Sequence, residues 1–220
     1  MIGSVDLVFA RGMQYGAPTM AVNLAARVDG RLERGERARH AVVDALLDLI
    51  EQGDLRPTAS RIAERAGLSL RSVFHHFADL EALFAAAADR QLARVRRLAR
   101  PLARRGPLRA RLAAFVRQRV RLLEAITPVR RAALLMEPFS AEVAARLRRV
   151  RALGREEVAR LFAPELEGRR PADRRELLAA LTAVSGWHTW EALRAHERLS
   201  RPRAARALAR MLAALLEGGT

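Results

Sequence analysis

Apolar side chains recur three and four positions apart along most of the chain, which is the spacing of amphipathic helices. No alternating stretch is long enough to build a sheet, so we expect an all-α fold. The pattern is divided into about nine helices by proline, by glycine and by the predicted helix caps Thr58, Ser69, Asp79 and Ser140. The helices are expected at 36–52, between Thr58 and Gly67, at Leu70–His75, from Asp79 toward Pro101, and at 107–125, 128–137, 140–163, 172–196 and 201–217.

Residues 1–35 show no helix-length pattern, because glycine and proline interrupt them repeatedly. We predict that most of this segment is a flexible arm, and a start codon assigned too early explains it equally well. The remaining chain is predicted to form a small three-helix domain at 36–90 and a larger helical domain at 91–220.

Two short predicted helices on either side of Gly67 are too small to fold alone, so the helix at 36–52 must supply the surface on which they pack. Gly67 permits a turn that a side chain would strain, and Ala63 permits close approach. The residues expected to point inward are Ile62, Ala66, Leu68 and Val73. Those expected to point outward are Leu70, Arg71, Ser72 and His75.

The outward set has the chemistry that reads duplex DNA. A helix in the major groove reads base edges, while hydroxyls and helix N-termini hold phosphates on either side. Arg71 can bind a guanine edge through two hydrogen bonds, and Leu70 can contact a thymine methyl. The predicted DNA-binding residues are Thr58, Ser60, Ser69, Leu70, Arg71, Ser72, Phe74 and His75.

This stretch resembles the TetR family of transcription regulators. The matching features are Thr58, Ile62-Ala63, Ala66-Gly67-Leu68-Ser69, Ser72-Val73-Phe74, His76-Phe77 and Glu81-Ala82-Leu83. The resemblance implies an N-terminal helix-turn-helix domain and a divergent domain that binds a small effector. It also implies a homodimer, formed through the last two helices, that leaves a palindromic operator when the effector binds. The regulator would then be a repressor.

Two positions depart from the family pattern. Phe74 stands where the family usually has a tyrosine, and Leu80 where it usually has a lysine, so two customary phosphate contacts are lost. Arg37 and Arg39 are the nearest basic residues that can compensate.

The last two predicted helices carry more apolar residues than one face needs, which favours a dimer interface. The residues that can line an effector pocket are Met136, Phe139, Trp187, His188, Trp190 and Glu191. Plain core or dimer interface is the competing interpretation for the tryptophans, because large rings are enriched in both.

The formal net charge of +16 changes this picture little, because the charge does not gather on the predicted DNA reader. Residues 36–90 hold 7 arginines against 9 acids, whereas residues 94–131 hold 13 arginines against one acid, Glu124. A GC-rich genome explains the absence of lysine. The scarcity of acids in 94–131 is compatible with an anionic partner, such as the DNA backbone.

The sequence offers little to an enzyme, because it has no cysteine, phosphate-binding glycine loop or nucleophile motif. The adjacent His75 and His76 point to different helix faces, so no metal or other cofactor is expected. Without cysteine or an apolar run that could span a bilayer, a cytoplasmic protein without a membrane partner is expected. The high charge also leaves open a nucleoid or RNA-binding architectural protein, whose binding would hardly distinguish sequences.

Overall fold

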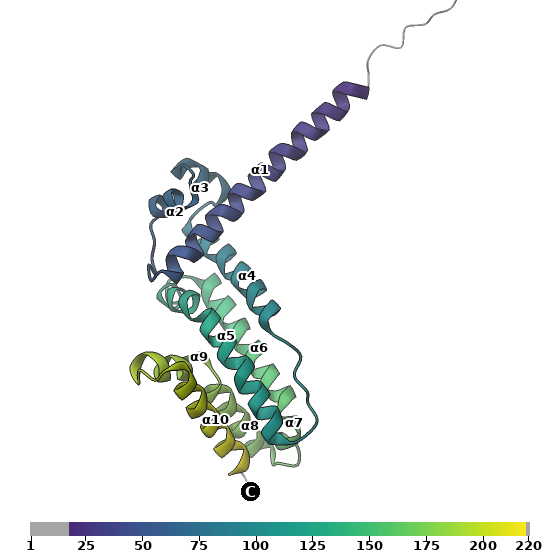
Figure 1. The fold of residues 1–220 in the computed structure, drawn as a ribbon, viewed down its shortest axis with the longest axis vertical. Coiled ribbons are helices and arrows are strands. Elements are labelled where there is room, and N and C mark those ends of the chain that lie inside the picture. The colour runs from purple at the N-terminus through teal and green to yellow at the C-terminus, as the bar shows by residue number, and fades with distance from the viewer. Residues whose placement is uncertain (1–17, 219–220) are drawn as a thin grey trace, which may run out of the picture. The chain divides into compact units, whose positions relative to one another are not determined.

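The computed structural model describes the backbone of residues 18–218 and the side chains of residues 32–218. Within this range the chain forms α-helices, one π-helical turn and no strand, which confirms the all-α prediction (Figure 1). Contacts divide the chain into two compact units, Met1–Ala41 and Val42–Thr220. No helix among the described residues is long and apolar enough to cross a membrane.

Helix α1 (Pro18–Glu51) belongs to both units. It was predicted to start near residue 36 but begins at Pro18, so residues 18–35 of the predicted arm are helical. A glycine inside a helix costs only about 1 kcal/mol relative to alanine, so Gly30 and Gly35 need not interrupt it. Residues 1–17 of the arm lie outside the described residues.

In the second unit, three short-to-medium helices follow α1: α2 (Ala59–Ala66), α3 (Leu70–His76) and α4 (Leu80–Leu98). They pack with the part of α1 after Ala41 around one apolar core, as expected for short helices that need a supporting surface. The fully buried members of this core include Val42, Leu46, Ile50, Ile62, Val73 and Leu83.

The rest of the unit consists of α5 (Leu108–Met136), α6 (Ala141–Leu161), α7 (Ala163–Leu166), α8 (Pro171–Val184), α9 (Trp187–Glu191), the π-helical turn η1 (Ala192–His196) and α10 (Arg201–Glu217). A second apolar core joins α5, α6, α8, α9, η1 and α10. Its most buried members include Phe115, Phe162, Leu181, Trp190, Leu208 and Leu212. Figure 1 shows α2 and α3 at one end of this unit and the α4–α5 connection at the other.

Pro128 was predicted to open a new helix, but α5 continues through it. Proline removes one backbone hydrogen bond and crowds the preceding turn. Side chains supply donors to carbonyls near this point: the Thr127 hydroxyl donates to the Leu123 carbonyl at 2.7 Å, and the Gln91 amide donates to the Ala125 carbonyl at 2.6 Å. These bonds help the helix to persist despite the proline.

The single helix predicted at 172–196 is interrupted at Ser185 and Gly186. The Ser185 hydroxyl donates back to the Leu181 carbonyl at 2.7 Å. A side chain at Gly186 would bring a Cβ within 3.1 Å of the Ala183 carbonyl oxygen, so glycine permits the tight approach that redirects the chain. A serine–glycine pair is a recognised cause of such a bend.

Candidate DNA-binding surface

Helices α2 and α3 are joined by a turn that depends on Gly67. This residue has φ +66° and ψ +31°, a left-handed conformation that side chains disfavour. Its N–H donates to the carbonyls of Ala63 and Glu64, and the Leu68 N–H also donates to Ala63. Nothing lies within 4 Å of the position that a Cβ would take, so conformation and not space requires glycine here. This agrees with the predicted turn.

Both helices begin with a hydroxyl cap. The Thr58 hydroxyl oxygen accepts the Arg61 N–H at 3.3 Å, and the Ser69 hydroxyl oxygen accepts the Ser72 N–H at 3.1 Å. Such caps fix the start of each helix. Because each oxygen acts as an acceptor in the cap, its O–H can still donate to a phosphate. Thr58, Ser69 and the neighbouring Ser60 are all exposed.

The inward and outward residues of α3 separate as predicted. Val73 is 1% exposed and belongs to the first apolar core, whereas Leu70 is 43% and Phe74 47% exposed. Arg71 and His75 are exposed, and Ser72 is half-buried. The helix therefore presents two large apolar side chains together with polar ones, a combination typical of a surface that contacts a partner.

Helices α2 and α3 carry Arg61, Arg65 and Arg71, and of these three only Arg71 has no ion pair among the described residues. Arg61 on α2 pairs with Asp54 at 2.5 Å, and Arg65 lies 3.7 Å from Asp48. Among the described residues no acid pairs with Arg71, so its guanidinium keeps its donors available for a ligand.

The positions that depart from the family pattern differ in their surroundings. Leu80 is half-buried and packs against the first apolar core, so it helps to stabilise the core on which α2 and α3 pack. Phe74 is 47% exposed, so part of its side chain reaches solvent. Arg37 and Arg39 belong to the first unit.

Comparisons with known proteins agree with this geometry. The sequence pattern of bacterial regulatory proteins of the tetR family matches residues 42–87. This range covers α2 and α3 and the adjoining parts of the supporting helices α1 and α4. Residues 42–87 form a helix-turn-helix domain of the TetR family. The chain therefore carries the DNA-binding domain of these bacterial regulatory proteins.

Solved structures of other regulators share the fold. A TetR-family transcriptional regulator from Streptomyces coelicolor has a TM-score of 0.64 at 22% identity, covering 84% of this chain and 82% of that chain. A transcriptional regulator from Rhodococcus sp. Rha1 has a TM-score of 0.59 at 22% identity, covering 84% of this chain and 96% of the other. No curated protein matches the chain in sequence. The structural likeness extends the TetR-like fold well beyond the DNA-binding domain.

The residues predicted to line an effector pocket do not gather around one cavity. Trp187 and Trp190 lie in the second core, where their indole N–H groups donate to the Thr127 hydroxyl at 3.1 Å and to Glu124 at 3.0 Å. His188 is exposed, Phe139 is 82% exposed, and Glu191 pairs with Arg131 at 2.8 Å. Met136 does line a pocket. The effector role of these residues remains a prediction.

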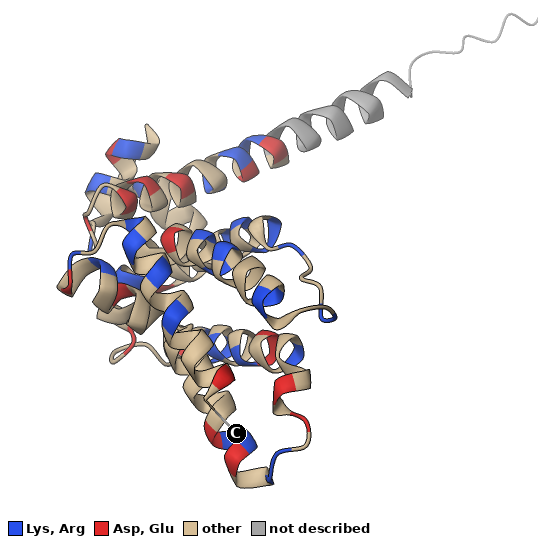
Figure 2. Cartoon of the chain, turned by 60° about the horizontal axis from the view of Figure 1, so that its bottom comes forward, with Lys and Arg blue, Asp and Glu red and all other residues tan. Residues whose placement is uncertain are grey.

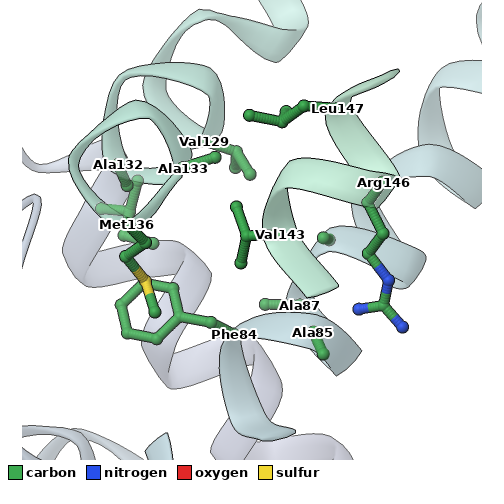
Figure 3. A pocket seen from close by; sticks show the side chains of 12 residues that line it. Phe84, Ala85, Ala87, Val129, Ala132, Ala133, Met136, Val143, Arg146 and Leu147 are labelled. Carbon is green, nitrogen blue, oxygen red and sulfur yellow. The ribbon is translucent and has the colours of Figure 1, made fainter. Parts of the chain in front are cut away.

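That pocket lies between α1, α4, α5 and α6, with Phe84 and Met136 at one side and Arg146 at the other (Figure 3). Its lining is Ile50, Phe84, Ala85, Ala87, Ala88, Val129, Ala132, Ala133, Met136, Val143, Arg146 and Leu147. Of these residues, Met136 alone was predicted from the sequence to line a pocket. Apolar residues of a helical stripe look the same in a sequence whether they face a filled core or a pocket.

Several arginines of the stretch at 94–131 form ion pairs with acids that are distant in the sequence. These arginines pair with Glu51, Glu157, Glu165 and Glu191, which all lie outside the stretch. Figure 2 shows basic residues, in blue, spread over most helices of the unit. The basic α4–α5 connection lies at the opposite end from α2 and α3, which argues against its contacting the same DNA backbone.

Proposed function

We propose that this regulator binds a palindromic operator as a homodimer and represses transcription until a small effector releases it. The observation that carries the proposal is the exposed face of α3, where Leu70, Arg71 and Phe74 point away from a well-packed support. A reading helix needs both features, because its side chains must reach bases while its backbone stays fixed.

In the proposed complex α3 enters the major groove. Arg71 binds a guanine edge through two parallel hydrogen bonds, and Leu70 contacts a thymine methyl. The phosphates on either side accept hydrogen bonds from donors on α2 and α3 and at the caps of these helices, namely Thr58, Ser60, Ser69, Ser72 and His75. Phe74 packs its exposed ring edge against the backbone sugars.

The proposed dimer forms through α8 and α10, which pack against each other in one chain. Their most apolar residues already fill the chain's own core, so the surplus apolar surface expected from the sequence is smaller than predicted. Half-buried residues remain at the edge of that core, and a second copy can cover them: Leu177, Leu178, Met211 and Leu215. Twofold symmetry then places two reading helices about one helical turn of DNA apart, or a multiple of it.

The pocket between α1, α4, α5 and α6 supports effector control. Helix α4 contributes Leu83 to the core that holds the reading helices and contributes Phe84 and Ala85 to the pocket lining. A ligand that changes the position of α4 therefore acts on the support of α3. Closely packed helices adopt a few discrete arrangements, so a small displacement of α4 can also change the position of α3.

A footprint on the promoter region next to the protein's own gene, made at two salt concentrations, tests the proposal. We expect one protected palindrome that remains distinguishable from flanking DNA at the higher salt concentration. An architectural protein would instead protect DNA without sequence preference, and its binding would collapse as salt increases. That second pattern would contradict the proposed function.

A further inference from the structure

Three arginines on α5 are largely buried, and they differ in their partners. Arg111, with a side chain 4% exposed, forms an ion pair with Glu165. Arg119, with a side chain 13% exposed, pairs with Glu157 at 2.9 Å and also lies 4.7 Å from the centre of the Phe115 ring. Arg130 is only 7% exposed, yet no described residue forms a hydrogen bond or an ion pair with it. Arg130 therefore stands out within α5.

The surroundings of Arg130 are apolar on one side and carry a net positive charge on the other. Its guanidinium lies 5.9 Å from the centre of the Trp187 ring. Ile126 and Leu134, four residues before and after it on α5, pack against the second core. Arg151 also lies nearby, and it pairs with Glu137 at 3.1 Å. Glu137 is the carboxylate near both guanidinium groups, but its ion pair is with Arg151, so the charge of Arg130 has no ion-pair partner.

Arg130 carries a buried Nε–H group that has no hydrogen-bond partner among the described residues, which is costly for a charged side chain. Burial lowers the pKa of Arg130, Arg151 lowers it further, and Glu137 opposes both effects. Arginine nevertheless stays charged at neutral pH, so the charge must be tolerated or balanced by a ligand. The ring of Trp187 offsets only part of the cost, because a cation–π contact is weaker than a buried, hydrogen-bonded ion pair.

We propose that Arg130 is the binding site for the carboxylate of a small organic acid whose apolar body packs beside Trp187. Arginine binds a carboxylate through two parallel hydrogen bonds, which would satisfy the unpaired Nε. The apolar neighbours select an organic anion over inorganic phosphate, because they cannot hydrogen-bond the remaining phosphate oxygens. The acid would be a second ligand of the regulator, because Arg130 does not line the pocket between α1, α4, α5 and α6 in which we place the effector.

The chain's two tryptophans, Trp187 and Trp190, make the site observable without DNA. We would titrate the full-length protein with sodium benzoate and with sodium octanoate while recording tryptophan fluorescence. Benzamide tests the need for a negative charge, sodium phosphate tests the need for an apolar body, and sodium chloride controls for ionic strength. We expect a saturable change with at least one of the two acids and none with the other three compounds.

Arg130→Met should weaken the binding of that acid by about tenfold or more, because it removes a charge-assisted hydrogen-bond donor. Arg121→Met is the matched control, since Arg121 is an exposed α5 arginine without an ion pair among the described residues. The affinity of the Arg121→Met variant for the acid should equal that of the unmodified protein. A lack of saturation with both acids, saturation with benzamide or phosphate, or equal losses in the two variants would each overturn the proposal.

Thermal unfolding without ligand separates a binding arginine from a structural one. Arg130→Met should leave the midpoint unchanged or raise it, because it removes an unpaired buried charge. Arg119→Met should lower it, because Glu157 loses its partner. If Arg130→Met lowers the midpoint as much as Arg119→Met does, Arg130 is structural and the proposal fails. Neither measurement involves DNA, so their outcome is distinguishable from a failure of the proposed operator binding.

Discussion

Leu70 and Phe74 lie one turn apart on α3, and both expose nearly half of their surface. Large apolar side chains on a helix that also buries Val73 are not needed for folding. Their exposure has a physical reason if the helix meets thymine methyl groups and sugars. The single arginine between them, Arg71, has no competing acid among the described residues.

Phe74→Tyr should strengthen DNA binding. The added hydroxyl extends from a half-exposed ring and can donate to a phosphate, which is worth about 1 kcal/mol. Because phosphates carry no sequence information, the gain should be similar on preferred and random duplexes, as measured by fluorescence anisotropy. Phe139→Tyr, at an 82% exposed position outside the helix-turn-helix, is the control and should change neither affinity. A gain confined to the preferred duplex would argue against a phosphate contact.

Several single-residue roles were predictable from sequence because they depend on local geometry. Thr58, Ser69, Asp79 and Ser140 cap their helices as predicted, and Gly67 makes its turn. The role of Glu124 was not predictable, because it depends on distant segments. Its carboxylate accepts the Trp190 indole N–H and pairs with Arg194, both at 3.0 Å. Glu124, the one acid among residues 94–131, thus links α5 to α9 and η1.

Among the helices, those with strong local signals match their predicted bounds. Helix α10 begins at Arg201 and ends at Glu217, as predicted from Ser200, Pro202 and Gly218. The errors arose where a local signal competes with tertiary contacts. Pro128 indicated a break that Thr127 and Gln91 help to prevent by supplying hydrogen bonds. The apolar periodicity across 172–196 is continuous, so it gave no sign of the bend at Ser185 and Gly186.

Helices α5 and α7 are linked by the ion pair between Arg111 and Glu165, which can be tested with the variant Glu165→Gln. Arg111 is 4% exposed and also donates to the Leu161 carbonyl at 2.7 Å, so the variant leaves an uncompensated buried charge. We expect a loss of about 3 kcal/mol in the free energy of unfolding, measured with urea.

The control is Asp173→Asn. Asp173 pairs with Arg170, whose side chain is 84% exposed, and an ion pair in solvent contributes about 1 kcal/mol or less. If Glu165→Gln and Asp173→Asn cost the same, the pair between Arg111 and Glu165 does not stabilise the end of α5 in the way we describe.

At the scale of the whole molecule, charge is a weak guide. The net charge of +16 did not locate the DNA-binding surface, because the arginines are spread over most helices and many pair with acids outside the arginine-rich stretch. Motif order and the apolar pattern located it instead. The effector and dimer surfaces could not be located in the same way, because core, pocket and interface positions share one apolar periodicity.

The proposed dimer predicts twice the mass of one chain by light scattering at micromolar concentration. Met211→Arg on α10 should shift the protein toward a single chain, because it places a charge at the proposed interface. Leu153→Arg, at a 40% exposed position on α6, should leave the mass unchanged. A single-chain mass for the unmodified protein that persists with operator present would contradict the twofold arrangement.

The most direct test of the account is the affinity of Arg71→Ala for the preferred operator and for random duplex DNA, measured side by side at one salt concentration. Arg160→Ala, which removes an exposed arginine at the end of α6, is the control. If Arg71 reads a base edge, its loss weakens operator binding by about 1 to 3 kcal/mol and random binding far less. Equal losses on both duplexes, or no loss on either, would contradict the reading of DNA by this face of α3.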